Sequence, residues 1–257
     1  MIPNELVVYV LCGVGAGLMG GLLGVGGGVV LVPLMAVFGG IGVREAVPVS
    51  LTAIVASSFA ASNSYLKKGM VDLELTVIIA LVMVMGNITG SYLSAVVPSD
   101  VTRLALTAVL LFTAVQLLVG TGSQSVSTFK RIRHDRYPLC AVLALFIGAL
   151  AGLIGIGGGE LLVPLLFLVG GVSLSTARGT SSLVIGFSAA AACAVYFLND
   201  RINLSILPPV VFGMIVGAKL GSILGTRARP WMVKTLYVAV AIYLSQRLSW
   251  HVIEAWW

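Results

Sequence analysis

Two glycine clusters carry the residues of this sequence whose types and spacing best suit the binding of a ligand. Residues 21–34 read GLLGVGGGVVLVPL, and residues 152–165 read GLIGIGGGELLVPL. Glycines at four of five positions weaken a helix, since each costs about 1 kcal/mol relative to alanine. We therefore expect a helix to break at each cluster and restart, so that its bare N–H groups and positive dipole end bind an anion. The predicted binding residues are Gly24, Gly26, Gly27, Gly28, Gly155, Gly157, Gly158 and Gly159.

A second interpretation of the clusters stays open, in which the glycines only permit close packing of helices. In lipid, irregular backbone is tolerated where it is buried in protein or lines an aqueous cavity. Pro33 and Pro164 follow the two clusters. A proline there loses little if a new helix is just beginning, because the N–H groups of a first turn have no partner within the helix. The pattern therefore predicts two restarted half-helices.

Hydroxyl side chains lie downstream of both clusters and could donate hydrogen bonds to a bound oxyanion. They are Ser50 and Thr52 in the first half, and Thr180, Ser181 and Ser182 in the second. Serine and threonine also join membrane helices to one another by hydrogen bonds. Their spacing does not decide between the two roles, so substrate binding and helix packing both stay open.

Three further polar residues fall inside apolar stretches. Glu160 directly follows the second cluster, Lys219 lies near the middle of residues 204–226, and Asn87 lies within residues 73–97. An ionisable residue in a membrane span is a functional hypothesis by default. Lys219 could attract an anion, and Glu160 could carry a coupling proton or pair with Lys219; Asn87 is a weaker candidate of the same kind. The structural alternatives are a neutralising pair that joins two segments and a lysine that reaches the membrane surface.

The composition indicates the solvent that surrounds these residues. Apolar residues make up 59% of the 257-residue chain and charged residues 9%, with a mean hydropathy of +1.10. Because a soluble domain carries about 25% charged residues, this chain suits lipid. The excess of 15 basic over 9 acidic residues is assigned to loops rather than to a nucleic-acid partner, and the three cysteines to apolar segments. The expected apolar segments are residues 6–23, 29–38, 47–66, 73–97, 104–119, 139–154, 161–169, 177–198, 204–226 and 231–248.

The two clusters belong to an internal repeat. Ten of the 14 aligned positions are identical at an offset of 131 residues, and the offset holds downstream, where it pairs Tyr65 with Tyr196. The sequence therefore predicts a first transmembrane repeat (residues 1–119), a basic linker (120–138) and a second repeat (139–257). The expected fold is an all-α polytopic membrane protein, in which each repeat has a glycine-broken first element and three spanning helices.

The short segment after each cluster bears on how the halves are oriented. It has about half of the roughly 20 residues that a spanning helix needs. If each broken element counts as one crossing, the halves are parallel and the basic residues divide 8 to 6 between the two sides. If it turns back or crosses twice, the halves are inverted and the division is 10 to 4. The positive-inside rule favours inversion in the inner (plasma) membrane, with the linker in the cytoplasm and both termini outside.

The paired G-x-G-G-G-x4-P elements at residues 24–33 and 155–164 resemble those of the TauE/SafE sulfite exporter family. The likeness covers nearly the whole chain apart from the linker. Residues 179–181 read Gly-Thr-Ser, which is similar to the family's motif after the second element, whereas residues 48–50 read Pro-Val-Ser. The resemblance implies transport of sulfite, sulfonates or related sulfur anions, usually outward, and the departure in the first half implies an asymmetric site.

The predicted function is therefore a secondary transporter that exports a small sulfur-containing anion, driven by the membrane potential or by a proton gradient. Outward movement of an anion gains about 2.3 kcal/mol per charge per 100 mV. A passive anion channel and an importer of the same substrates are the alternatives. An enzyme is disfavoured, because the only histidines are His134 and His251 and no nucleophile motif occurs. The expected partners are the anion and the lipid bilayer, without nucleic acid, cofactor or metal; a homo-oligomer stays open.

Overall fold

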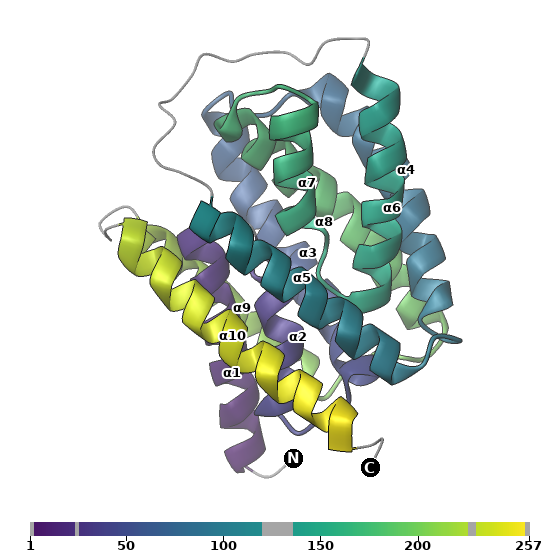
Figure 1. The fold of residues 1–257 in the computed structure, drawn as a ribbon, viewed down its shortest axis with the longest axis vertical. Helices are drawn as coiled ribbons and strands as arrows, with labels where there is room; N and C mark the ends of the chain where they lie inside the picture. The colour runs from purple at the N-terminus through teal and green to yellow at the C-terminus, as the bar shows by residue number, and fades with distance from the viewer. Residues whose placement is uncertain (1–2, 24–25, 120–135, 226–229, 255–257) are drawn as a thin grey trace.

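The computed structural model describes residues 3–23, 26–119, 136–225 and 230–254 (Figure 1). These residues form ten α-helices and one short π-helix, with no strand among them, which confirms the predicted all-α class. Most of the predicted linker, residues 120–138, lies outside the described ranges. The elements are α1 (Pro3–Leu23), α2 (Gly28–Val37), α3 (Val43–Lys67), α4 (Leu73–Leu93), α5 (Ser99–Val119), α6 (Tyr137–Ile154), α7 (Gly159–Pro164), η2 (Leu165–Val169), α8 (Leu174–Leu198), α9 (Leu207–Gly225) and α10 (Pro230–Glu254).

Six helices of the described part are long and apolar enough to cross a membrane: α1, α3, α4, α5, α6 and α8. The sequence predicts three spanning helices in each half after the broken element. In the second half these correspond to α8, α9 and α10, and only α8 is among the six candidate spans. The apolar stretch of α9, Leu207–Gly221, is shorter than a span, and α10 carries Lys234, Gln246 and Arg247 among its apolar residues. The chain is a multi-pass helical membrane protein, and the inverted orientation of its halves stays a prediction.

The first broken element is a hairpin that turns back inside the protein. Tyr9 Oη donates to the carbonyl oxygen of Gly39 at 3.3 Å, and Cys12 Sγ donates to that of Leu34 at 3.6 Å. Further along α1, the backbone of Ala16 lies against Gly27. The 10 residues of α2 therefore run antiparallel to α1 and return toward the end at which α1 begins.

The second broken element has the same form. Helix α6 ends at Ile154 with Gly155 as its C-cap, and α7 begins at Gly159. Arg136, which precedes α6, donates from Nη1 to the carbonyl oxygen of Val169 at 2.9 Å, so the end of η2 lies beside the start of α6. Both clusters therefore interrupt a helix, and in both the chain reverses its direction after the interruption.

The two prolines do not lie in the first turn of the restarted helices, and this expectation is wrong. Pro33 is the sixth residue of α2, and Pro164 is the sixth and last residue of α7. The restarted helices begin at Gly28 and Gly159, the last glycine of each cluster, so each proline falls five residues after the helix start. A proline in the second turn removes one N–H from the helix ladder. After Pro164 the chain continues as the wider η2, in which the Gly170 N–H bonds to the carbonyl of Leu165 at 3.1 Å.

Glycines at Gly-x3-Gly spacing produce two close helix crossings. A methyl group on Gly217 or Gly221 of α9 would collide with the backbone of α1. A methyl group on Gly86 or Gly90 of α4 would collide with the backbone of α6 at Ala149. Small residues let membrane helices approach this closely. Under the 131-residue offset α1 corresponds to α6 and α9 to α4, so each half packs its first helix on the other half (Figure 1).

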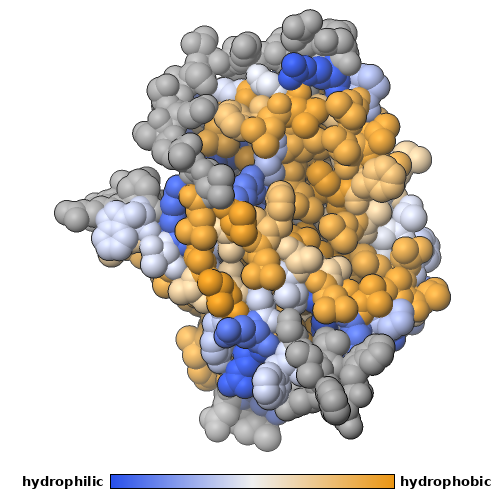
Figure 2. Space-filling model, in the orientation of Figure 1, coloured by the Kyte–Doolittle hydropathy of each residue, from blue (hydrophilic) through white to orange (hydrophobic). Residues whose placement is uncertain are grey.

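The surface of the molecule suits a bilayer. Figure 2 shows apolar residues over the broad middle of one face and hydrophilic residues gathered toward its two ends. Large apolar side chains are exposed on several helices, among them Phe146 on α6 (67%) and Leu168 on η2 (70%). Contiguous exposed apolar surface of this kind marks a surface that lipid or another apolar partner covers.

Candidate functional site

The two glycine clusters meet in the interior of the protein. Gly28, the first residue of α2, lies against the second cluster: a Cβ on it would stand 2.8 Å from the carbonyl oxygen of Ile156 and collide with Ile54. Gly28 and Ile156 are both buried. Because α2 begins at one cluster and α7 at the other, the starts of the two half-helices come to the same region.

The backbone at both clusters requires glycine. Gly26 and Gly27 have φ angles of 93° and 75°, and Gly155, Gly157 and Gly158 have φ angles of 77°, 70° and 84°. L-residues with a side chain rarely adopt this left-handed region. Gly27 and Gly158 cap the starts of α2 and α7 without a side-chain cap of their own, so the N–H groups of the first turns are left to partners from elsewhere. Gly24 lies outside the described residues.

Glu160 brings a carboxylate to this contact. The residue is only 7% exposed, and its carboxylate accepts hydrogen bonds from the N–H groups of Val29 and of Glu160 itself. Val29 is the second residue of α2 and holds the position equivalent to Glu160 in the first half. A carboxylate from α7 therefore occupies the positive end of α2, which the sequence assigns to an anion. Oε2 of Glu160 has no hydrogen-bond partner.

Apolar side chains close the region around the glycine contact. Gly157 lies against Ile54 and Ile185, and a Cβ on Gly158 would stand 2.6 Å from Cε of Met83. These side chains are buried, so little water screens the charges between them. In such surroundings a hydrogen bond to an ion is stronger than in water, and an unpaired polar atom is costly. The unpaired oxygen of Glu160 therefore lacks the hydrogen bond that would offset the free-energy cost of its burial.

The hydroxyl residues of the first half support the fold around the site. Ser50 is fully buried and donates to the carbonyl oxygen of Gly155 at 2.8 Å, which ties α3 to the second cluster. Thr52 donates to the carbonyl of Pro48 at 2.9 Å and contacts Cys193 Sγ at 3.1 Å. Both hydroxyls thus have protein partners in this conformation, which is the helix-packing role that the sequence left open.

The hydroxyl residues of the second half divide between two roles. Thr180 accepts the Asp72 N–H at 3.1 Å and so holds the loop between α3 and α4. Ser182 donates to the carbonyl of Ser58 at 3.2 Å. Ser181, which the repeat pairs with Ser50, is 1% exposed and its Oγ has no hydrogen-bond partner. Ser181 is therefore the hydroxyl of this group without any hydrogen-bond partner in the protein.

Asn87 and Lys219 lie in different surroundings. Asn87 is fully buried where α4 crosses α6, beside Gly148 and Gly152, and neither atom of its side-chain amide has a hydrogen-bond partner. Lys219 is exposed on α9 and forms no ion pair with the buried Glu160. The pairing of Glu160 with Lys219, which the sequence left open as one alternative, is not formed in this conformation, because Glu160 is buried and Lys219 is exposed.

Two tyrosines belong near the site although the sequence did not single them out as ligands. Tyr196 is 2% exposed, and its Oη lies 2.9 Å from the Gly152 carbonyl oxygen and 2.8 Å from Ser94 Oγ. Tyr237 on α10 lies within Coulombic range of Glu160, and its Oη lies 2.8 Å from Thr113 Oγ1. The repeat places a tyrosine at position 65 opposite Tyr196, which was the available signal.

Comparisons with known proteins agree with this architecture. The sequence profile of the family described as "Sulfite exporter TauE/SafE" matches residues 9–248. A "Probable membrane transporter protein" of Xylella fastidiosa (strain Temecula1 / ATCC 700964) is 32% identical over 97% of this chain and 98% of its own length. The "Probable membrane transporter protein YunE" of Bacillus subtilis (strain 168) is 25% identical over 93% of this chain and 94% of its own length. These names fit the expectation that the chain is not an enzyme. No solved structure gives a significant match.

Proposed function

Because the chain belongs to the TauE/SafE sulfite exporter family of membrane transporters, we propose that it is a secondary transporter that exports a small sulfur-containing anion such as sulfite or an organosulfonate. The observation that carries the proposal is the contact between the starts of α2 and α7 in the protein interior. Two half-helix ends that meet inside a membrane offer N–H groups and positive dipole ends to an anion, as broken helices do in other transporters.

The substrate site combines these backbone groups with the hydroxyl that has no partner. The N–H groups after Gly27 and Gly158 donate hydrogen bonds to the anion, and Ser181 supplies a further donor. Oxyanions of sulfur carry two or three acceptor oxygens, so they match a site whose donors come from two directions. Ser50 donates a hydrogen bond to the protein, whereas its repeat counterpart Ser181 does not, and this difference makes the site asymmetric.

We propose further that the two repeats are inverted relative to the bilayer, with the linker in the cytoplasm of a bacterial-type inner membrane and both termini outside. Three observations support this: the 10 to 4 division of basic residues, the hairpins that return each chain segment to its starting end, and the exchanged crossings of α1 with α9 and α4 with α6. Inversion brings the two half-helix starts toward one centre from opposite sides.

A second direction of transport is favoured by the position of Glu160. When it is charged, its carboxylate holds the Val29 N–H and competes with a substrate anion for the same end of α2. A proton on Glu160 removes its charge and leaves this end to the anion, so the proton and the anion bind together. Co-transport of one proton with a monovalent anion follows an inward proton gradient and produces uptake, whereas an anion that moves alone is expelled by an inside-negative potential.

Flux measurements in proteoliposomes separate these possibilities. Sulfite, thiosulfate, taurine and sulfoacetate are tested under an imposed potential without a pH gradient, and under a pH gradient without a potential. Potential-driven, saturable flux supports the exporter, pH-driven uptake supports the proton-coupled importer, and flux without saturation indicates a channel. Absence of flux and of binding for all four compounds would contradict the sulfur-anion assignment.

A further inference from the structure

A small pocket lies at the end of the molecule where α3 and α5 begin and where α4 and α8 end. Its polar lining consists of Arg44, Ser94, Thr102, Tyr196 and Arg201, and its apolar lining of Val47 and Leu153. The free space between them holds about one water molecule in this conformation. No acidic residue contributes to the lining, so the charge of the pocket comes from two guanidinium groups.

Both guanidinium groups keep donors available. Arg44 Nη2 donates to the carbonyl oxygen of Val97, and Arg201 Nη1 donates to Ser94 Oγ at 3.2 Å. Neither makes an ion pair with a carboxylate of the described residues. The neighbouring carboxylate of Glu45 instead accepts from Asn203 Nδ2 at 2.7 Å. Since a guanidinium has five N–H donors, most of the hydrogen-bonding capacity of both arginines is unused by protein side chains.

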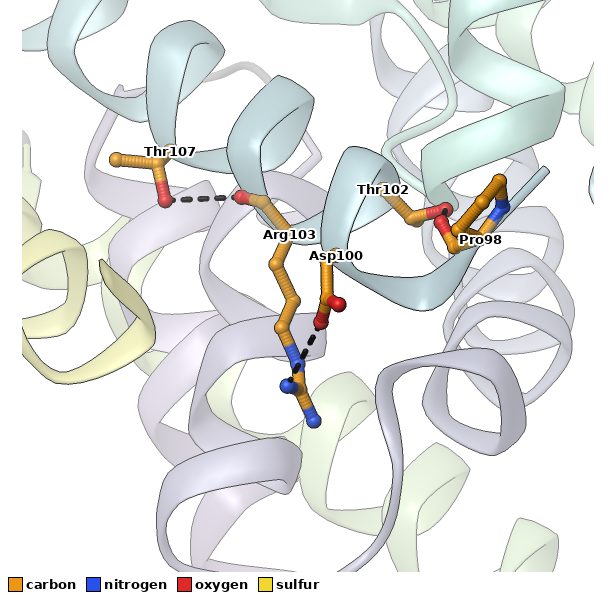
Figure 3. Close-up of polar contacts among 5 residues, drawn as sticks. All are labelled: Pro98, Asp100, Thr102, Arg103 and Thr107. Carbon is orange, nitrogen blue, oxygen red and sulfur yellow. Dashed lines mark hydrogen bonds and ion pairs between the residues drawn. The ribbon is translucent and has the colours of Figure 1, made fainter. Parts of the chain in front are cut away.

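A third arginine at the same end shows the contrast. Arg103 on α5 forms an ion pair with Asp100 at 3.3 Å, and Figure 3 shows its side chain directed along that of Asp100. Thr102, which lines the pocket, comes from the same turn of α5 (Figure 3). Arg103, which does not line the pocket, is therefore neutralised by a carboxylate. Arg44 and Arg201, which line it, are not.

The second glycine cluster lies behind the inner lining of the pocket. The backbone of Val47 stands 2.9 Å from the position that a Cβ on Gly155 would take. Tyr196 Oη lies 2.9 Å from the carbonyl oxygen of Gly152, in the helix turn that leads into the cluster. A ligand in the pocket is thus separated from the start of the candidate substrate site by one layer of side chains.

We propose that this pocket is an anion-binding vestibule, in which Arg44 and Arg201 hold an oxyanion of the sulfite or sulfonate class at one end of the transport path. The proposal rests on the proposed transport function. Paired guanidinium groups bind oxyanions through two parallel hydrogen bonds each, and the anion replaces the Arg201–Ser94 and Tyr196–Ser94 contacts as the pocket widens.

The internal repeat does not duplicate this arginine pair. At the 131-residue offset, the positions of Arg44 and Arg201 correspond to Ser175 and Met70. The repeat therefore supplies no second arginine pair at the opposite end of α3 and α8. Anion binding by this pair is expected on the side on which Arg44 and Arg201 lie. In the proposed topology that side is the outside, where an exporter releases the anion and an importer captures it.

The test measures transport and binding by the full chain with Arg44→Ala, Arg201→Ala and the double variant, and uses Arg103→Ala as the matched control. The half-saturating sulfite concentration should rise roughly tenfold in the double variant, while the maximal rate changes little, because charged hydrogen bonds are lost only from the captured state. Arg103→Ala should leave both values near those of the parent. Arg44→Lys with Arg201→Lys should recover part of the affinity, since charge returns without the two-pronged geometry.

Equilibrium binding of sulfite to the purified protein, measured by calorimetry, keeps the two proposals distinguishable. Parent binding that is lost in the double variant upholds the vestibule even if no flux is seen, and then only the transport proposal fails. Flux and binding that respond equally to Arg103→Ala and to the double variant would overturn the vestibule and leave transport standing. Absence of both flux and binding in the parent overturns both.

Discussion

At the scale of residues, the central feature is a carboxylate that occupies a helix end suited to a substrate. Glu160 contacts the Val29 N–H across the meeting point of the two halves. Its second oxygen is buried without a hydrogen-bond partner, and such an unpaired polar atom costs free energy. We propose that this side chain moves or changes its charge during transport, and the next variant tests that proposal.

Glu160→Gln removes the charge with little change of shape. We expect the variant to transport anions with a rate that no longer depends on an imposed pH gradient, while flux driven by a potential persists. Radiolabelled sulfite uptake into proteoliposomes measures both. Glu74→Gln, at the exposed start of α4, is the control and should behave as the parent. Retained dependence on the pH gradient in Glu160→Gln would remove the carboxylate from the coupling mechanism.

Gly27→Val and Gly158→Val test the glycine site. Both positions have left-handed backbone, which costs roughly 1–3 kcal/mol for a residue with a side chain and displaces the starts of α2 and α7. Transport should be abolished while membrane insertion, followed by immunoblotting of the membrane fraction, stays intact. Gly42→Ala is the control, because Gly42 has an ordinary φ of −63° and open space around it. Normal transport by both valine variants would show that the glycines serve packing alone.

At the scale of elements, the sequence contained the helix breaks but not their relation to each other. Four glycines in five positions suffice to predict that a helix stops and restarts, because the cost is local. The contact of Gly28 with Ile156 depends on how two distant segments pack, and no local pattern encodes it. For the same reason the sequence left open whether Glu160 pairs with Lys219: it places Lys219 on a helix but does not say which face of the helix carries it.

The crossing of α1 with α9 offers a test with an internal control. A methyl group on Gly17 would collide with the carbonyl of Met214, whereas one on Gly15 would meet only Leu34 Cδ1 at 3.5 Å, an ordinary contact. Gly17→Ala should therefore lower the thermal unfolding midpoint in detergent, and Gly15→Ala should leave it unchanged or raise it, since alanine favours a helix by about 1 kcal/mol. Equal midpoints for the two variants would mean that this crossing is looser than described.

At the scale of the whole molecule, the distribution of basic residues predicts how the chain is oriented across the membrane. The packing of the helices does not determine this orientation, so it has to be measured. With cysteines introduced singly, Lys130→Cys in the linker should be labelled by a membrane-impermeant maleimide only after the cells are opened. Ser205→Cys, exposed before α9, should be labelled from outside. The reverse pattern would invert the assigned topology and place the Arg44–Arg201 vestibule in the cytoplasm.

The exchanged crossings also have a consequence for biosynthesis. Gly17 and its partner residue Met214 are separated by almost the whole chain, yet each half packs its first helix on a helix of the other half. At ribosomal rates the bare glycine face of α1 waits roughly 10–40 s for α9 to emerge. During that interval α1 has no native neighbour on this face except lipid or the insertion machinery. Assembly is thus postponed until translation is nearly complete, and a truncated nascent chain has no way to finish its first repeat.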